Sequence, residues 1–462
     1  MSSFGLAKEH RLMVVLLVCG LFIESLTQTL VSPALPAIMR EFDTNASTAQ
    51  WLASGYSIVT ASTIPLSAYI IGRFSTRRIF IFCLCLFVAG SALCAFAPNF
   101  IVLLVGRLFQ AACIGGAMPM VMTVVLLCFP AEKRGGAIGL IGLVIGAAPA
   151  AGPALAGFLV DSIGWRWIFI IVGAFAALIL VLSILKLKSM EGFDRVKFDT
   201  ISVILTFAGM IPLIYGLSVI STSDDLWMPV TCIIAGIIFL ALYAQRQLKL
   251  PEPMLNIRIL KKARYASVII CIMLIYTSFV GSGVIFPLMV QNGQQMSAAA
   301  GGTAMLPGAL LGAILGLVGG SLFDRHGPKV TIIPGALIML SGAVFLSILQ
   351  IDSSFWMDMA AYTLFAVALQ FTMTPLNTFG YNSLMNEQIH HAQPITTTSI
   401  HVSSALGPAV LVAISASSTA IWPEEAITNQ AYLGCHIAFI AGAILIGIAF
   451  LITLTFLKRD KD

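Results

Sequence analysis

The chain has 462 residues, of which 59% are hydrophobic and only 10% are charged, and its mean hydropathy is +0.98. A soluble domain carries about 25% charged residues, so this composition excludes an ordinary soluble protein and indicates a membrane protein that crosses the bilayer many times. The formal net charge of +5 mostly reflects basic residues in the loops between apolar stretches, as is usual in membrane proteins. We therefore do not expect nucleic-acid binding.

Fourteen apolar stretches are long enough to cross a bilayer as helices, which takes about 20 residues each. In chain order they cover approximately residues 12–36, 48–70, 78–97, 100–128, 135–160, 166–186, 200–221, 228–246, 265–290, 299–323, 329–350, 356–381, 395–420 and 432–457. We therefore predict an all-α polytopic membrane protein with fourteen transmembrane helices.

The basic residues indicate how these helices are oriented. The 25 Lys and Arg residues gather at the two termini and in alternate loops, except that Arg40 and Arg166 fall in the opposite loops and Arg107 lies within a span. Cytoplasmic loops carry the excess of basic residues in membrane proteins. We predict a cell-membrane protein with both termini in the cytoplasm.

An internal repeat divides the chain. Sequence landmarks of the first half recur about 254 residues later in the second half. The matched landmarks are the loops 72–78 and 324–329, Gly152-Pro153 and Gly407-Pro408, and Pro33 and Pro287. Parallel six-helix repeats are an architecture of transporters. We predict an N-terminal six-helix bundle over 1–190, two inserted helices with their linkers over 191–262, and a C-terminal six-helix bundle over 263–462.

The first span contains the most unusual residue of the chain, Glu24. A carboxylate near the centre of a bilayer costs about 2.5–3.5 kcal/mol on insertion scales, and such residues mark functional sites. Gly20, Glu24, Gln28 and Ser32 recur at every fourth position and share one face of a helix, with Thr27 beside them. Since this polar stripe cannot face lipid, we expect it to line a central cavity.

Other polar residues at membrane depth are further candidates. Arg107 is the only basic residue deep in a span, and a buried guanidinium needs a partner; it either tunes Glu24 or joins helices structurally. Gln110 lies one turn from Arg107 and is a candidate for the cavity. Three more candidates for the cavity lie in the twelfth and thirteenth spans, namely Gln370, Asn377 and His401, although His401 could also be a satisfied structural histidine.

Several segments resemble the major facilitator superfamily, in its fourteen-helix drug:proton antiporter branch (the EmrB/QacA type). The segment from Glu24 to Pro36 resembles the first-helix motif of that branch, although the family usually has Asp at position 24. Arg107-Leu108-Phe109-Gln110 matches the membrane-embedded arginine motif, and the segment from Gly152 to Gly157 resembles the antiporter signature, with Ala156 replacing one glycine. The resemblance extends over nearly the whole chain.

The resemblance also implies a cytoplasmic gate built from the loops of the two halves. The first copy includes Arg73 and Arg77, but it has Gly72 where the family usually has an Asp that latches the gate. The second copy is intact and contains Asp324, Arg325, Gly327 and Lys329. In the fifth span, Gly152 and Pro153 form a predicted hinge, because proline removes a backbone hydrogen bond and bends a helix.

The function that the resemblance implies is proton-coupled efflux of amphipathic or cationic small molecules by alternating access. We expect Glu24 to bind the proton in one state of the cycle and to release it in another, with Arg107 in a coupling role; the alternative is that Glu24 is a structural buried acid. An alternative transport function is export or flipping of an endogenous metabolite or lipid.

Other function classes have little support in the sequence. We find no HExxH or GxSxG motif and no paired acids for an enzyme, and the nine cysteines have no metal-ligand spacing. A phosphate-binding loop of the GxxxxGK[ST] type is also missing from the sequence. We therefore expect the proton gradient to drive transport, without a nucleotide, a metal or another cofactor. We also expect the protein to work as a monomer in membrane lipid.

Overall fold

The computed structural model describes residues 8–31, 34–44, 46–130, 133–187, 199–220, 225–296, 298–421 and 427–459. Within these ranges every regular element is helical and no strand occurs. The predicted all-α fold is therefore confirmed. Ser32 and Pro33, which belong to the predicted polar stripe and to the repeat, lie outside the described residues.

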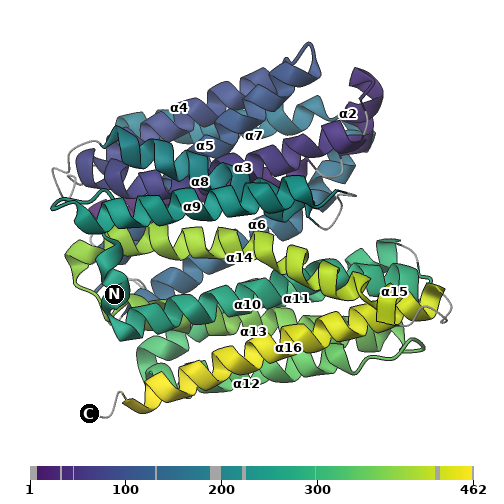
Figure 1. Cartoon of the computed structure of the whole chain (residues 1–462). Helices are drawn as coiled ribbons and strands as arrows, with labels where there is room; N and C mark the ends of the chain where they lie inside the picture. The colour runs from purple at the N-terminus through teal and green to yellow at the C-terminus, as the bar shows by residue number, and fades with distance from the viewer. Residues whose placement is uncertain are drawn as a thin grey trace.

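Long helices dominate the fold (Figure 1). They are α1 (Lys8–Leu30), α3 (Ala46–Arg73), α4 (Thr76–Ala95), α5 (Phe100–Cys128), α6 (Arg134–Ile163), α7 (Arg166–Lys186), α8 (Thr200–Val219), α9 (Trp227–Lys249), α10 (Ala263–Leu288), α11 (Ala298–His326), α12 (Pro328–Ser347), α13 (Phe355–Tyr381), α14 (Ile389–Ala416) and α16 (Ile427–Arg459). Shorter elements are α2 (Leu35–Phe42), α15 (Ser418–Ile421) and single turns at Ile257–Lys261, Met289–Gly293 and Asn386–Gln388.

Eleven of these helices are long and apolar enough to cross a membrane, judged on the described residues. The other three long helices, α1, α3 and α6, do not meet that criterion over their described residues, although shorter apolar segments lie at Leu12–Gln28 and Arg134–Val144. The chain is thus a membrane protein with many spans, and the count of fourteen stays a prediction.

The helices form two bundles whose packing follows the sequence repeat. In the first bundle α4 packs against α5 and α7, and in the second α12 packs against α13 and α16 in the same way. Each bundle has its own hydrophobic core, one running from Met13 to Leu187 and the other centred on α10, α13 and α16. The domain boundaries predicted above are consistent with this grouping but remain a prediction.

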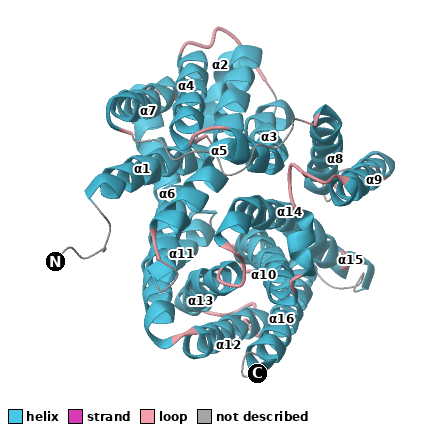
Figure 2. Ribbon diagram, turned by 90° about the vertical axis from the view of Figure 1, so that its left-hand side faces the viewer, coloured by secondary structure: helices cyan, strands magenta, loops and turns pink. Residues whose placement is uncertain are grey.

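The helices α8 and α9 pack against each other as a hairpin beside the bundles (Figure 2). From this hairpin, α8 contacts α3 of the first bundle and α14 of the second. On another side of the molecule α6 packs directly against α11. The two bundles therefore meet along two lines, with space between them.

Both chain ends lie at one end of the molecule, which we call the terminal end, defined by the start of α1 and the end of α16 (Figure 1). Because consecutive long helices run in alternate directions, α6 also begins and α11 also ends there. Gly327 makes the turn between α11 and α12 with a φ of 80°, a conformation that side chains with a Cβ rarely adopt.

Candidate functional site

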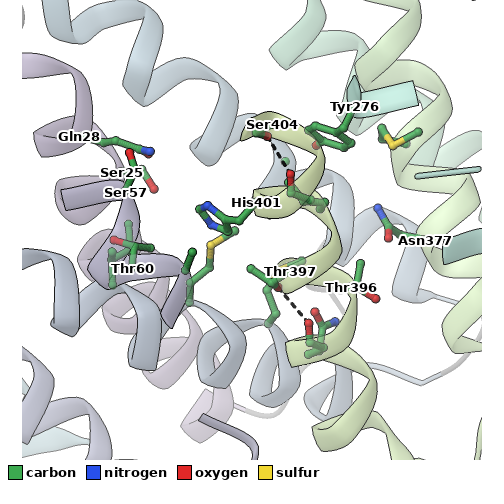
Figure 3. Close-up of a pocket in the computed structure, with 18 of the residues that line it drawn as sticks. Ser25, Gln28, Ser57, Thr60, Tyr276, Asn377, Thr396, Thr397, His401 and Ser404 are labelled. Atoms are coloured by element: carbon green, nitrogen blue, oxygen red, sulfur yellow. Dashed lines mark hydrogen bonds between the residues drawn. The ribbon is translucent and has the colours of Figure 1, made fainter. Parts of the chain in front are cut away.

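A cavity of about 400 Å³ lies between the two bundles (Figure 3). Ligand sites in proteins typically measure about 300–1,000 Å³, so this space suits one small molecule. The first bundle contributes two polar pairs to the wall, which are Ser25 and Gln28 from α1 and Ser57 and Thr60 from α3.

The second bundle supplies the opposite wall. Gln370 and Asn377 from α13 line the cavity, and so does His401 from α14. Together with Gln28, these are residues that the sequence predicts for the cavity. In Figure 3, His401 projects from its helix between the two walls.

Several wall residues were not predicted from the sequence. They are Ser25, Ser57, Thr60, Tyr276, Gln393 and Thr396, together with Ile214 and Ser218 from the inserted helix α8. On α14 a signal was available, because Gln393, Thr397 and His401 recur at every fourth position and share one helix face. No comparable polar spacing marks α8, whose place at the wall depends on packing against α3 and α14.

Thr27 and Gln110 do not line the cavity. Both are completely buried within the first bundle. The Thr27 hydroxyl donates to the carbonyl of Ile23 at 2.7 Å, and the Gln110 amide donates to the hydroxyl of Ser91 at 2.9 Å. Both side chains therefore make their hydrogen bonds within the first bundle. The prediction that Thr27 and Gln110 face the cavity is wrong.

Glu24 also points away from the cavity, although its neighbour Ser25 lines it. The Glu24 side chain is 1% exposed, and its Oε1 accepts a hydrogen bond of 3.0 Å from the thiol of Cys113 on α5. Its Oε2 has no hydrogen-bond partner among the described residues. Gly20 faces the bundle interior as well, since a Cβ there would lie 2.7 Å from the Phe80 ring. Of the stripe residues that the structure describes, Gln28 is thus the one that reaches the cavity.

Arg107 on α5 is fully buried and held by groups other than a carboxylate. One of its amino groups donates to the carbonyl of Thr27 at 3.3 Å and to the side chain of Gln110 at 3.0 Å. Its guanidinium carbon lies 4.3 Å from the centre of the Tyr56 ring, a distance suited to a cation–π contact. Among the described residues the structure records no ion pair between Arg107 and Glu24.

Asp324, one of the predicted gate residues of the second half, joins the two bundles at the terminal end. Both carboxylate oxygens of Asp324 accept hydrogen bonds from the first turn of α6, from the backbone amides of Gly135 at 2.9 Å and Gly136 at 2.7 Å. The first amides of a helix have no partner within it and attract negative charge. Asp324 of α11 therefore caps α6 across the interface between bundles.

The same contact depends on glycine. A Cβ at Gly135 would lie 2.3 Å from the carbonyl oxygen of Gly320, so only glycine permits α6 and α11 to approach this closely. Beside it, Arg134 donates to the side chains of Asn382 at 3.5 Å and Asn386 at 2.7 Å. Among the described residues, all recorded hydrogen bonds between the two bundles lie at this end.

The first-half gate residues make no comparable bridge in the described structure. Gly72 is buried near the end of α3, Arg73 ends that helix in an exposed position, and Arg77 donates to the carbonyl of Ile184 within its own bundle. In the second half, Arg325 is exposed and Lys329 is partly buried at the start of α12. Gly152 and Pro153 lie inside α6, and their role as a hinge stays a prediction.

A family model described as "Major Facilitator Superfamily" matches residues 17–408, which is most of the chain and covers helices of both bundles. The chain belongs to the major facilitator superfamily. This membership, with the central cavity between two related helix bundles, makes the protein a membrane transporter rather than an enzyme.

Relatives within the superfamily cover nearly the full chain. The chain is 34% identical over 457 residues to "Uncharacterized MFS-type transporter YcnB" of Bacillus subtilis, covering 98% of this chain and 96% of that protein. It is 32% identical over 465 residues to "Lincomycin resistance protein LmrB" of the same organism, covering 98% and 97%. Among solved structures, the human organic anion transporter MFSD10 superposes with a TM-score of 0.67 at 14% identity over 97% of this chain and 100% of that one, which supports the shared fold.

Proposed function

We propose that this superfamily member is an antiporter that exports amphipathic drugs across the cell membrane in exchange for protons. The similarity to a lincomycin resistance protein supports drug export. The cavity between the bundles suits one small molecule, and its mixed polar and apolar wall suits an amphipathic one. The observation that carries the proton-coupling proposal is the buried Glu24 carboxylate on the helix that also forms part of the cavity wall.

Glu24 and the cavity lie on different sides of α1, so we infer that coupling passes through the helix rather than through direct competition at one carboxylate. The Cys113 thiol donates to the carboxylate, and a proton on Glu24 removes the negative charge that strengthens this hydrogen bond. A changed contact between α1 and α5 would shift Ser25 and Gln28 at the cavity wall. Arg107 would take part by tying α5 to the backbone of Thr27 on α1.

Alternating access requires that each end of the cavity opens in turn. The bridge from Asp324 to the start of α6 joins the bundles at the terminal end, and we infer that it closes the cavity there. With both termini in the cytoplasm, as the distribution of basic residues predicts, this arrangement is closed toward the cytoplasm. Breaking the bridge would then admit substrate from the cytoplasm.

Proteoliposomes with an acidic interior test the proposal. We expect wild-type protein to accumulate labelled lincomycin while protons leave, and a protonophore to abolish the accumulation. Glu24→Gln removes the titratable group at nearly constant volume and should abolish accumulation while substrate binding persists. Uptake by Glu24→Gln that still follows the pH gradient would rule out Glu24 as the coupling residue. Transport of only an endogenous metabolite or lipid would favour the alternative function.

A further inference from the structure

The cavity wall carries no fixed charge among its described residues. No Asp, Glu, Lys or Arg lines it. Glu24 and Arg107, the charged residues predicted for coupling, are 1% and 0% exposed and bonded inside the first bundle. A cation placed in a cavity without a counter-charge loses its hydration without compensation. The wall therefore disfavours a permanently charged substrate.

Hydrogen-bonding groups are nevertheless available for a ligand. Gln393 and Asn377 both line the cavity. The amide nitrogen Nε2 of Gln393 and the amide oxygen Oδ1 of Asn377 are buried and have no hydrogen-bond partner among the described residues. The other end of the Gln393 amide is fixed, because Oε1 accepts from the Tyr381 hydroxyl at 3.2 Å. The Gln393 side chain is 1% exposed, so an unsatisfied amide there is costly.

The hydroxyl groups of the wall add acceptors rather than donors. Thr60, Thr397 and Ser404 donate their protons to backbone carbonyls at 3.2, 2.9 and 2.8 Å. Their lone pairs remain available to accept. A ligand that fits this wall offers hydroxyl or amide groups, which both donate and accept.

The rest of the wall is apolar and adaptable. Met118 and Met122 from α5 and Met373 from α13 line the cavity, together with Ile214 of α8. Methionine side chains are flexible and fit ligands of varied shape. One part of a ligand would contact these residues while its polar groups reach the amides.

We propose that the cavity binds uncharged amphipathic compounds that carry hydroxyl or amide groups, and that it discriminates against permanent cations. This inference rests on the proposed export function and narrows its substrate class. It assigns Asn377 and Gln393 as the residues that hold the polar groups of the substrate, and it separates the binding site from the proton site at Glu24.

Equilibrium binding to the purified full-length protein tests the inference. The two probes are chloramphenicol, an uncharged compound with hydroxyl and amide groups, and tetraphenylphosphonium, a permanent cation without hydrogen-bond donors. We expect saturable binding of chloramphenicol to wild-type protein and affinity for tetraphenylphosphonium at least about tenfold weaker. This comparison needs no variant.

Substitutions at Asn377 locate the site. Asn377→Leu should weaken chloramphenicol binding about tenfold, the usual effect of losing a hydrogen bond in a buried site. Asn377→Asp places a carboxylate in the wall with little change of volume and should raise the affinity for tetraphenylphosphonium. The matched control is Thr363→Val, which removes a hydroxyl from the same helix away from the cavity and should change neither affinity.

Two outcomes would overturn the inference. One is tighter binding of tetraphenylphosphonium than of chloramphenicol by wild-type protein, with loss of that binding in Glu24→Gln. The other is no binding of chloramphenicol at millimolar concentration. Lincomycin accumulation in proteoliposomes is measured separately and tests the proposed function. If the protein exports lincomycin in exchange for protons but gives one of these two binding results, the substrate class is rejected and the proposed function stands.

Discussion

At the scale of single residues, the pairing of Glu24 with Cys113 is the most consequential contact. A carboxylate buried at membrane depth is stabilised only by the groups around it, and the Cys113 thiol is the one hydrogen-bond donor that the described structure places on it. Arg107, the obvious electrostatic partner in the sequence, is bonded to Thr27 and Gln110 instead. Cys113 is therefore a positioning residue for the proposed proton site.

Replacing Cys113 tests this pairing. Cys113→Ala removes the donor and should lower proton-driven lincomycin uptake about tenfold, as expected for a hydrogen bond to a charged group. Cys113→Ser keeps a donor of similar size and should retain most of the uptake and the wild-type pH profile. Cys85→Ser, an exposed cysteine on the neighbouring helix α4, is the control. Equal uptake and an equal pH profile in Cys113→Ala and wild type would show that the thiol does not position Glu24.

At the scale of helices, the inserted hairpin of α8 and α9 has two different roles. The outer helix α9 exposes large apolar side chains such as Ile234 and Ile237, as expected for a face in lipid. The inner helix α8 packs between α3 and α14 and brings Ile214 and Ser218 to the cavity wall. The insertion is therefore part of the cavity wall and of the proposed binding site.

A bulky residue on α8 tests that role. Ser218→Trp should fill part of the 400 Å³ cavity and weaken chloramphenicol binding by about tenfold or more, because overpacking a confined site costs about 1–3 kcal/mol. Ile234→Trp on the exposed face of α9 should bind like wild type. The measurement is equilibrium binding to purified protein. Unchanged affinity in Ser218→Trp would exclude α8 from the binding site.

The hairpin is also joined by an ion pair outside the membrane core. Asp199 precedes α8, and its carboxylate accepts hydrogen bonds from Arg246 of α9 at 2.6 and 2.9 Å. The hydrogen bond from Arg246 holds the pKa of Asp199 below its ordinary value of 3.8. A carboxyl group whose pKa is lowered in the folded protein stabilises the fold at pH values above its ordinary pKa. This contribution is lost as the pH falls through the lower pKa of the folded protein.

Thermal unfolding followed at two pH values measures this contribution. Asp199→Asn should lower the melting temperature slightly at pH 7, corresponding to about 1 kcal/mol or less for a partly exposed pair. The difference from wild type should shrink at pH 3 and below. Asp352→Asn, at an exposed position in a loop, serves as the control. A difference for Asp199→Asn that stays constant with pH would contradict the assignment.

At the scale of the whole molecule, the two bundles are joined through the first turn of α6. Asp324 from α11 caps Gly135 and Gly136, while Arg134 reaches Asn382 and Asn386 beyond α13. The first-half position that would supply the symmetric carboxylate is Gly72. The contact is consequently asymmetric. Asp324 makes the bridge between the bundles, whereas Gly72, at the equivalent position of the first half, has no side chain to make one.

Removing the Asp324 carboxylate should loosen the terminal end. Asp324→Ala should speed amide hydrogen exchange over the start of α6 about tenfold or more, because two backbone amides lose charge-assisted hydrogen bonds. Asp352→Ala, on an exposed loop, should leave exchange at α6 unchanged. Exchange at the wild-type rate in Asp324→Ala would show that the bridge does not hold the bundles together.

The sequence by itself determined the membrane class, the approximate positions of the long helices, the two related halves and the candidate residues Glu24, Arg107 and Asp324. These follow from local composition and spacing, since each long apolar stretch must satisfy its backbone as a helix in lipid. The directions of buried side chains could not be predicted in the same way. Residues four apart on a helix advance by about 40° around its axis, so Glu24 and Gln28 point to different neighbours.

Only the tertiary structure decided which neighbour each polar face meets. Packing of α1 against α5 places Glu24 beside Cys113, while Ser25 faces the cavity. Packing of α8 between the bundles adds Ser218 to the wall, and the crossing of α6 and α11 at Gly135 and Gly320 aims Asp324 at α6. These contacts join residues far apart in the chain, and their geometry depends on how helices pack rather than on spacing within any one of them.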